Sequence, residues 1–280
     1  MPTFETPEPI SVTAHVGAGS IHFTAGDRLD TVVEVRPTTP KRDKDVRAAE
    51  QTEVTYAGGV LTIRTKERYL IGPSGAVDVT VGLPTGSRAD ITGSWVQAFG
   101  EGRLGEIRMK TSTGDARFDE TGPLQLTVSH GAITVDRVEG MAEITSNSGN
   151  VRVGTVDGPA VLKNSHGSTT VGAVTGELRM SGANGAIDIA RAEASVTGTA
   201  TNGSLRVGEV VRGTVQLETS NGAIEVGIRE GTAAWLDVSS NRGHVRNALA
   251  ASEAPEQTEE TVKIRARSNW GNIDVLRAKA

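Results

Sequence analysis

Few side chains in this sequence have the type and spacing that catalysis requires. Asp188 and Glu225 stand at equivalent positions of a repeated pattern, and a polysaccharide-cleaving enzyme would need two or three such carboxylates converging in a cleft. Arg206 stands at the same position between them, and Arg246 follows in the next repeat. Alternating charges at this spacing predict a cross-strand ladder of ion pairs. We therefore expect no catalytic residues and no enzymatic activity.

The histidines give no signature of a metal site. His130 and His166 hold the same position two repeats apart, which for stacked strands is about 9 to 10 Å, too far for one metal ion to bind both. The sequence also lacks the repeated Gly-Gly-x-Gly-x-Asp of calcium-binding rolls and the Gly-x-x-x-x-Gly-Lys-Ser/Thr of phosphate-binding loops. We expect neither a metal ion nor a cofactor.

One aromatic residue stands where a binding partner can reach it. Trp270 and Arg242 occupy equivalent positions before a glycine in neighbouring repeats, where an indole and a guanidinium can stack. This pair is the candidate partner-binding site. The alternative is that Trp270 only covers the base of the preceding loop. Asn184, Asn202 and Asn221 hold the same position in three successive repeats and predict either a ladder of amide hydrogen bonds or turn chemistry alone.

These positions belong to a repeat of about 18 residues. Nine similar tripeptides end in glycine, with spacings of 17, 18, 18, 18, 18, 19, 21 and 28 residues. A second glycine series runs half a period out of phase, so each repeat contains two turns. The first series, the predicted structural turn glycines, consists of Gly114, Gly131, Gly149, Gly167, Gly185, Gly203, Gly222, Gly243 and Gly271.

Between the turns the pattern is that of β-strands. The second and fourth residues after most first-series glycines are apolar, such as Ile187 and Ile189 after Gly185, and the residue between them is mostly polar. A repeat of this length cannot bury an apolar face alone, but stacked copies can. The sequence therefore predicts an all-β fold, a parallel β-solenoid (single-stranded β-helix or β-roll) with about 18 residues and two strands per coil.

We expect all 280 residues to form one solenoid domain. Residues 105–280 hold the regular coils, with a loop insertion at about 249–261. Residues 1–104 hold irregular, elaborated coils that act as a cap. We expect each coil to stack on the one that precedes it in the sequence.

The ends of such a stack need cover, because an open row of strand hydrogen bonds can pair with another chain. In the N-terminal region the charged stretch 41–53 predicts a short surface helix, and 66–76 predicts a second excursion. The alternating stretch 31–36 predicts a strand of the second wall. At the other end, residues 277–280 offer charge but little cover for the C-terminal edge.

Composition excludes several classes of function. The chain has no cysteine, so it can form no disulfide, zinc–thiolate site or thiol nucleophile. A net charge of -5 lacks the basic excess of a nucleic-acid binder. The start has neither the basic nor the apolar region of a signal peptide, and no stretch approaches the roughly 18 apolar residues of a membrane helix. We expect a cytoplasmic protein without membrane insertion.

Three features of the sequence together resemble a known family. They are the recurrent Ser-Asn-Gly-x-Ile-x-Val pattern, the segment 79–86 (Val-Thr-Val-Gly-Leu-Pro-x-Gly) and the closing segment 270–275 (Trp-Gly-Asn-Ile-Asp-Val). In these the chain is similar to the bacterial putative-adhesin family of β-strand-repeat proteins, a domain of unknown function. The resemblance covers nearly the whole chain and implies a parallel β-solenoid. Because the shared motif is structural, it implies no catalytic residues.

The leading hypothesis is a non-enzymatic interaction or scaffold protein that offers regular faces to a protein partner or to copies of itself. The first alternative is a carbohydrate-binding or adhesion protein, which exposed aromatic residues in a row would favour; the predicted outward rows contain none. A polysaccharide-cleaving β-helix enzyme and a subunit that polymerises into filaments are the others. Nucleic acid is not an expected partner.

Overall fold

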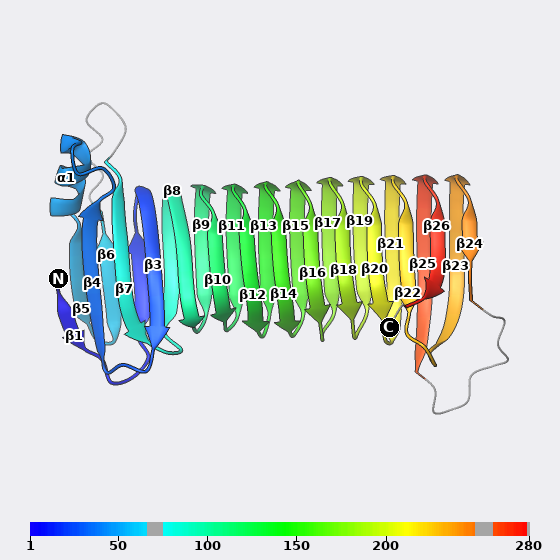
Figure 1. Ribbon diagram of the computed structural model, residues 1–280, viewed down its shortest axis with the longest axis horizontal. Coiled ribbons are helices and arrows are strands. Elements are labelled where there is room, and N and C mark those ends of the chain that lie inside the picture. Colours follow the sequence, from blue (N-terminus) through cyan, green and yellow to red (C-terminus); the bar gives the residue numbers. More distant parts are fainter. Residues whose placement is uncertain (66–74, 250–259, 279–280) are drawn as a thin grey trace. The chain divides into compact units, whose positions relative to one another are not determined.

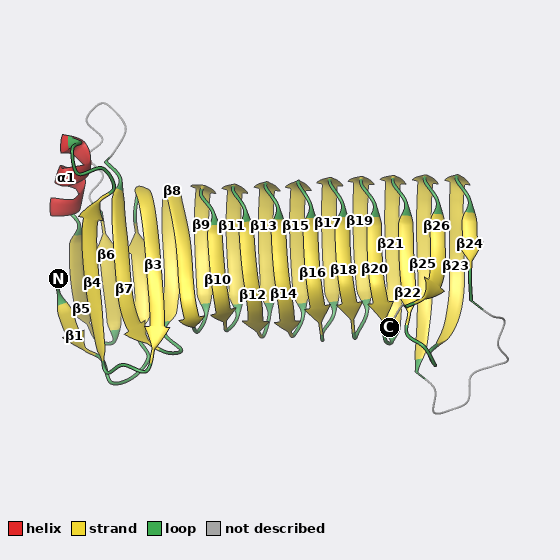
Figure 2. Cartoon of the chain, in the orientation of Figure 1, coloured by secondary structure: helices red, strands yellow, loops and turns green. Residues whose placement is uncertain are grey.

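The computed structural model of the protein describes residues 1–65, 75–249 and 260–278, in which strands account for nearly all the regular structure (Figures 1 and 2). The chain divides into two compact units, unit 1 (Met1–Glu139) and unit 2 (Gly140–Ala280). Most strands of each unit form coils of parallel strands, two strands to a coil. The predicted all-β parallel β-solenoid is therefore confirmed, whereas a single domain over the whole chain stays a prediction.

Unit 2 contains the most regular coils, and its strands form two walls. In each wall every strand pairs in parallel with the equivalent strand of the neighbouring coil. The first wall consists of β13 (Ala142–Ser148), β15 (Ala160–His166), β17 (Leu178–Asn184), β19 (Val196–Asn202), β21 (Gly213–Asn221), β23 (Ala233–Arg242) and β25 (Thr261–Trp270). The second wall consists of β14 (Val151–Asp157), β16 (Thr169–Val174), β18 (Ile187–Ala192), β20 (Leu205–Val210), β22 (Ile224–Ile228), β24 (Val245–Asn247) and β26 (Ile273–Arg277).

The core of unit 2 lies between the two walls and follows from the alternating pattern. Ile187 and Ile189 are buried while Asp188 between them reaches the surface, as expected of a strand with one apolar face. Ile187 stands in register with Thr169 on one side and Leu205 on the other. Equivalent residues thus stack in columns along the wall. Small aliphatic side chains suit this narrow interior, because they interdigitate where rings would not fit.

Unit 1 repeats the two-walled plan with more elaboration. Its strands are β1 (Thr3–Glu5), β2 (Ser11–His15), β3 (Ala18–Gly26), β4 (Asp30–Pro37), β5 (Glu53–Ala57), β6 (Val60–Arg64), β7 (Val77–Pro84), β8 (Arg88–Arg103), β9 (Ile107–Thr113), β10 (Ala116–Thr121), β11 (Leu124–His130) and β12 (Ile133–Glu139). The long β8 contributes to both walls. Its first part pairs with β2 and β9, and its second part pairs with β3 and β10.

The N-terminal edge of unit 1 is closed differently from our expectation. The stretch 31–36 lies in β4, but β4 runs antiparallel to β7 and to β1 instead of joining a parallel wall. Strand β5 is likewise antiparallel to β6. The predicted surface helix in 41–53 is confirmed as α1 (Asp43–Glu50). Most of the predicted second excursion, 66–76, lies outside the described residues.

The coils do not stack strictly in the order of the sequence, which corrects a second expectation. In unit 1 the β2/β3 coil lies between the β6/β7 coil and β8. In unit 2 the β25/β26 coil lies between the β21/β22 coil and the β23/β24 coil (Figure 1). The last strand of the chain is therefore inside the stack, and β23 and β24 form the outer coil. The edge of unit 2 is thus the β23/β24 coil, and not β26, which ends at Arg277.

The corners between first and second strands depend on glycine. A Cβ atom at Gly203 would overlap the carbonyl oxygen of Gly185 in the neighbouring coil, and one at Gly185 would overlap that of Gly167. Gly185 also has φ 139°, a conformation that side chains disfavour. Its N–H donates to the carbonyl oxygen of Asn202 at 3.0 Å, so the backbone ladder continues through the corner.

Inward polar side chains satisfy the carbonyl groups of these corners. The Ser240 hydroxyl donates to the carbonyl oxygen of Gly271 at 2.7 Å, and the Ser268 hydroxyl donates to that of Gly222 at 3.0 Å. Ser268 is buried, where an unpaired carbonyl group would be costly. The few polar residues at the inner side of the corner are thus part of the turn structure.

The close approach at the corner can be tested by adding one methyl group. We expect Gly203→Ala to lower the free energy of unfolding by more than about 2 kcal/mol, because the new Cβ forces two coils apart. Gly182→Ala is the matched control, since a Cβ there meets no atom closer than 3.4 Å and Gly182 stands in register with Ala200. Chemical unfolding monitored by circular dichroism measures both. Equal losses in the two variants would contradict the proposed role of the corner.

Candidate functional site

The residues that precede the corner glycines of unit 2 form one row, which we call the corner column. Each member ends a strand of the first wall and stands in register with the next, so the strand spacing of about 4.8 Å separates them. In spatial order the column contains Ser148, His166, Asn184, Asn202, Asn221, Trp270 and Arg242.

The three asparagines of the corner column are hydrogen-bonded to one another. The Asn202 amide nitrogen donates to the Asn184 side-chain oxygen at 2.9 Å, and the Asn221 amide nitrogen donates to that of Asn202 at 2.9 Å. A further bond of this kind, Asn241 to Asn269 at 2.9 Å, was missed by the sequence analysis. Both residues stand two positions before a corner glycine, which is the signal that could have revealed it.

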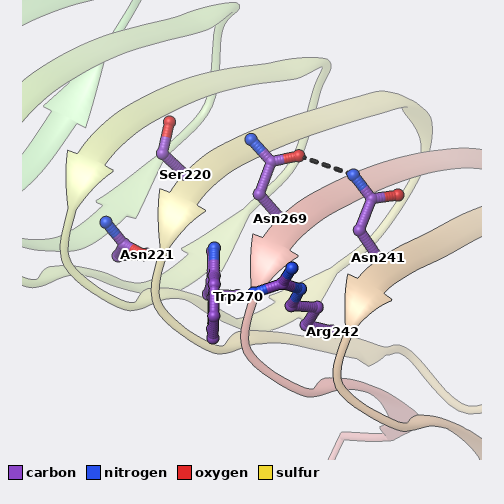
Figure 3. A pocket seen from close by; sticks show the side chains of 6 residues that line it. All are labelled: Ser220, Asn221, Asn241, Arg242, Asn269 and Trp270. Carbon is purple, nitrogen blue, oxygen red and sulfur yellow. Dashed lines mark hydrogen bonds between the residues drawn. The ribbon is translucent and has the colours of Figure 1, made fainter.

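The column ends in an aromatic and a cationic side chain. The Arg242 Cζ atom lies 4.2 Å from the centre of the Trp270 ring, and Figure 3 shows the two groups side by side. Trp270 is 54% exposed and stands in register with Asn221 on its other side. A stacked cation–π pair of this kind keeps an indole edge and guanidinium N–H groups available to a partner.

A shallow groove of about 360 Å³ surrounds this pair (Figure 3). An indole, a guanidinium, amides and a hydroxyl offer apolar surface and hydrogen bonds, which suit binding better than bond-breaking chemistry. The lining residues are Ser220, Asn221, Asn241, Arg242, Asn269 and Trp270.

Three outward charges of the second wall, Asp188, Arg206 and Glu225, are paired. Arg206 donates to Glu225 at 3.1 Å and to Asp188 at 3.4 Å. These two carboxylates raise the pKa of Arg206 above its ordinary value, and the hydrogen bond to Glu225 has the largest effect. The expected place of Arg246 beside Glu225 is wrong. Because β26 is inserted, Asp274 stands between them in register, so two carboxylates are neighbours there.

The two histidines lie in different units. His130 ends β11 in unit 1 and stands in register with Thr113. His166 belongs to the corner column, where its Nδ1 lies 3.3 Å from the carbonyl oxygen of Asn147. Over residues 1–65, 75–249 and 260–278, no group of three or more His, Asp or Glu side chains is arranged to hold a metal ion.

The turn glycines also divide between the units. Gly114 and Gly131 lie at corners of unit 1, and the other seven lie at corners of unit 2. A Cβ at Gly131 would overlap the carbonyl oxygen of Gly114, which is the same close approach as in unit 2. The corner is therefore built in the same way in both units.

Stacked two-strand coils with glycine corners define the class of protein as a parallel β-solenoid. Over residues 10–276 the sequence matches the family described as Toastrack DUF4097, and the chain belongs to this family. The predicted relationship is thereby confirmed. No curated protein is similar to the chain. Within the described part of the chain, no helix is long and apolar enough to cross a membrane.

The chain also matches solved structures of bacterial proteins at low sequence identity. One is a putative adhesin from Bacteroides fragilis NCTC 9343, with 14% identity over 98% of this chain and 95% of that chain and a TM-score of 0.40. Another is a putative lipid binding protein from Parabacteroides distasonis ATCC 8503, with 14% identity, 99% and 96% coverage and a TM-score of 0.43. A putative adhesin from the same strain has 11% identity, 98% and 95% coverage and a TM-score of 0.31.

The amide ladder makes a testable contribution to stability. Asn202→Ala removes two side-chain hydrogen bonds, and we expect it to lower the free energy of unfolding by about 1 kcal/mol. The control is Asn147→Ala, in which the exposed side-chain amide that is lost has no hydrogen-bond partner among the described residues. Urea unfolding of both variants provides the measurement. If the two variants are equally stable, the asparagines serve turn chemistry alone.

Proposed function

We propose that this protein is a non-enzymatic interaction protein that binds a protein partner through the corner column. The exposed Trp270–Arg242 pair in its groove is the observation that carries the proposal. Tryptophan and arginine are the residue types that most often dominate the energy of protein interfaces. The asparagine amides beside them supply hydrogen bonds around this anchor.

The backbone supports this role by holding the column in place. Except at Gly243 in the outer coil, the N–H of the corner glycine of unit 2 donates to the carbonyl oxygen of the column residue in the adjacent coil, as Gly203 does to Asn221 at 2.8 Å and Gly222 to Trp270 at 2.8 Å. The side chains of the column therefore project from a fixed frame. A preorganised surface loses less conformational entropy on binding than a mobile loop does.

The arrangement of charges favours binding over catalysis. Asp188 and Glu225 are both engaged by Arg206 on a wall face, where they do not converge on a cleft. The neighbouring Glu225 and Asp274 are flanked by Arg206 and Arg246 in the same row. Paired charges of this kind stabilise the sheet modestly. The cytoplasmic location stays a prediction from the sequence.

The anchor can be tested by removing the indole. We expect Trp270→Ala to abolish capture of the partner with an unchanged melting temperature, because the ring is half exposed. Wild-type and variant proteins are immobilised, exposed to a lysate of the native host, and the captured proteins are identified by mass spectrometry. The control is Trp95→Ala, which removes another exposed indole, 66% accessible, from unit 1.

A protein that wild type and Trp95→Ala capture, and that Trp270→Ala loses, supports the proposal. Arg242→Ala should weaken the same capture, because the guanidinium holds the indole. A partner that Trp270→Ala still captures in full would contradict the anchor. Loss of both capture and thermal stability would instead assign Trp270 the role of covering the loop before it.

A further inference from the structure

A second exposed tryptophan of unit 2 lies on the outer face of the first wall, away from the corner column. Trp235 of β23 is 63% exposed. It stands in register with Lys263 of β25, which stands in register with Thr214 of β21. The indole, the ammonium group and the hydroxyl thus form a row across three strands.

A parallel row two residues further along the strands completes the surface. It consists of Gln216, Arg265 and Asp237, again in register. Together the two rows line a groove of about 580 Å³, to which Leu236 and Ile264 also contribute. We call this the wall groove. The sequence did not reveal it, because Lys263 and Trp235 become neighbours only through the insertion of β25 beside β23.

Most charges around the wall groove neutralise one another. The Asp237 carboxylate accepts hydrogen bonds from Arg267 at 2.5 Å and from Arg265 at 3.3 Å. The two guanidinium groups hold the pKa of Asp237 below its ordinary value, and the hydrogen bond from Arg267 has the largest effect. Gln216 donates to Glu218 at 3.2 Å. Among the described residues, Lys263 has no carboxylate partner.

The local charge is therefore opposite in sign to that of the whole chain. The three cations Lys263, Arg265 and Arg267 outnumber the two carboxylates of Glu218 and Asp237 by one, whereas the chain carries a net charge of -5. A surplus of positive charge beside an exposed indole favours a ligand that combines an apolar face with a negative group.

We propose that the wall groove binds a carboxylated sugar chain, with a uronic acid ring stacked on Trp235 and its carboxylate paired with Lys263. The C–H groups on one face of a sugar ring can pack on the flat indole. Adjacent strand positions are separated by about 4.8 Å, so a carboxylate on the stacked ring can reach the neighbouring ammonium group. The Thr214 hydroxyl and the Gln216 amide can bind the sugar hydroxyl groups.

The same geometry argues against other anionic ligands. Nucleic acid and clustered phosphates need several available cations, whereas Arg265 and Arg267 are already engaged by Asp237. An acidic peptide would gain little from the flat indole face. The wall groove shares no residue with the groove at the corner, so this proposal does not depend on the proposed function.

The probe is polygalacturonate, tested by affinity electrophoresis in native gels of increasing polymer content. We expect the polymer to retard the wild-type protein, and Trp235→Ala and Lys263→Glu each to weaken the apparent affinity at least about tenfold. Methyl-esterified polygalacturonate should bind much less well, because it keeps the rings but lacks the carboxylates. Trp235→Ala should melt at the wild-type temperature, since the ring is mostly exposed.

Two controls match these changes elsewhere. Trp95→Ala removes an exposed indole from unit 1, and Lys163→Glu reverses an exposed charge on β15 of the same wall. Both should bind as wild type does. The proposal is wrong if wild type does not bind polygalacturonate, if Trp235→Ala binds with full affinity, or if the esterified polymer binds equally well. Binding only to polyglutamate or to phosphatidylglycerol vesicles would overturn it in favour of an acidic peptide or a lipid surface.

Discussion

The close approach of the backbone at each glycine corner is the constraint on which the rest of the structure depends. Two walls of parallel strands stack at about 4.8 Å, and the turn between them must advance by the same distance. At Gly185 and Gly203 this leaves no room for a Cβ, because the neighbouring carbonyl oxygen occupies its place. Once the corner is fixed, the residue before each glycine must project outward in a column. Inner hydroxyl groups, such as that of Ser268, complete the corner from inside.

Both candidate binding surfaces arise from one topological feature, the insertion of the β25/β26 coil between its neighbours. At the corner the insertion places Trp270 between Asn221 and Arg242. On the wall it places Lys263 beside Trp235. If the coils were stacked in sequence order, β23 would pair with β21. Trp270 would then not lie between Asn221 and Arg242, and Lys263 would not lie between Thr214 and Trp235. The regular coils therefore provide a rigid frame, and the exception to their order provides the distinctive chemistry.

Much of this architecture follows from the sequence because its signals are local. The glycine period marks the corners, and alternation such as that of Ile187, Asp188 and Ile189 marks the strands and their inward face. The order of the coils leaves no such signal, because every coil presents the same inward pattern and fits beside any other. Alternation also carries no direction, which explains why β4 was expected in a parallel wall. The neighbours of Trp270 and Trp235 depend on that order, so no sequence pattern could assign them fully.

The non-sequential order also bears on how each unit resists fraying. A coil at the end of a chain and at the edge of a sheet would open at little cost, because it is held from one side only. In unit 2 the last coil is paired on both sides, and the outer β23/β24 coil is continuous with other coils at both of its ends. The β2/β3 coil of unit 1 is flanked in the same way. The arrangement leaves Val245 of the outer coil 43% exposed, whereas Ile273 beside it is buried. The incompletely covered coil of unit 2 is therefore β23/β24, and that coil carries both Trp235 and Arg242.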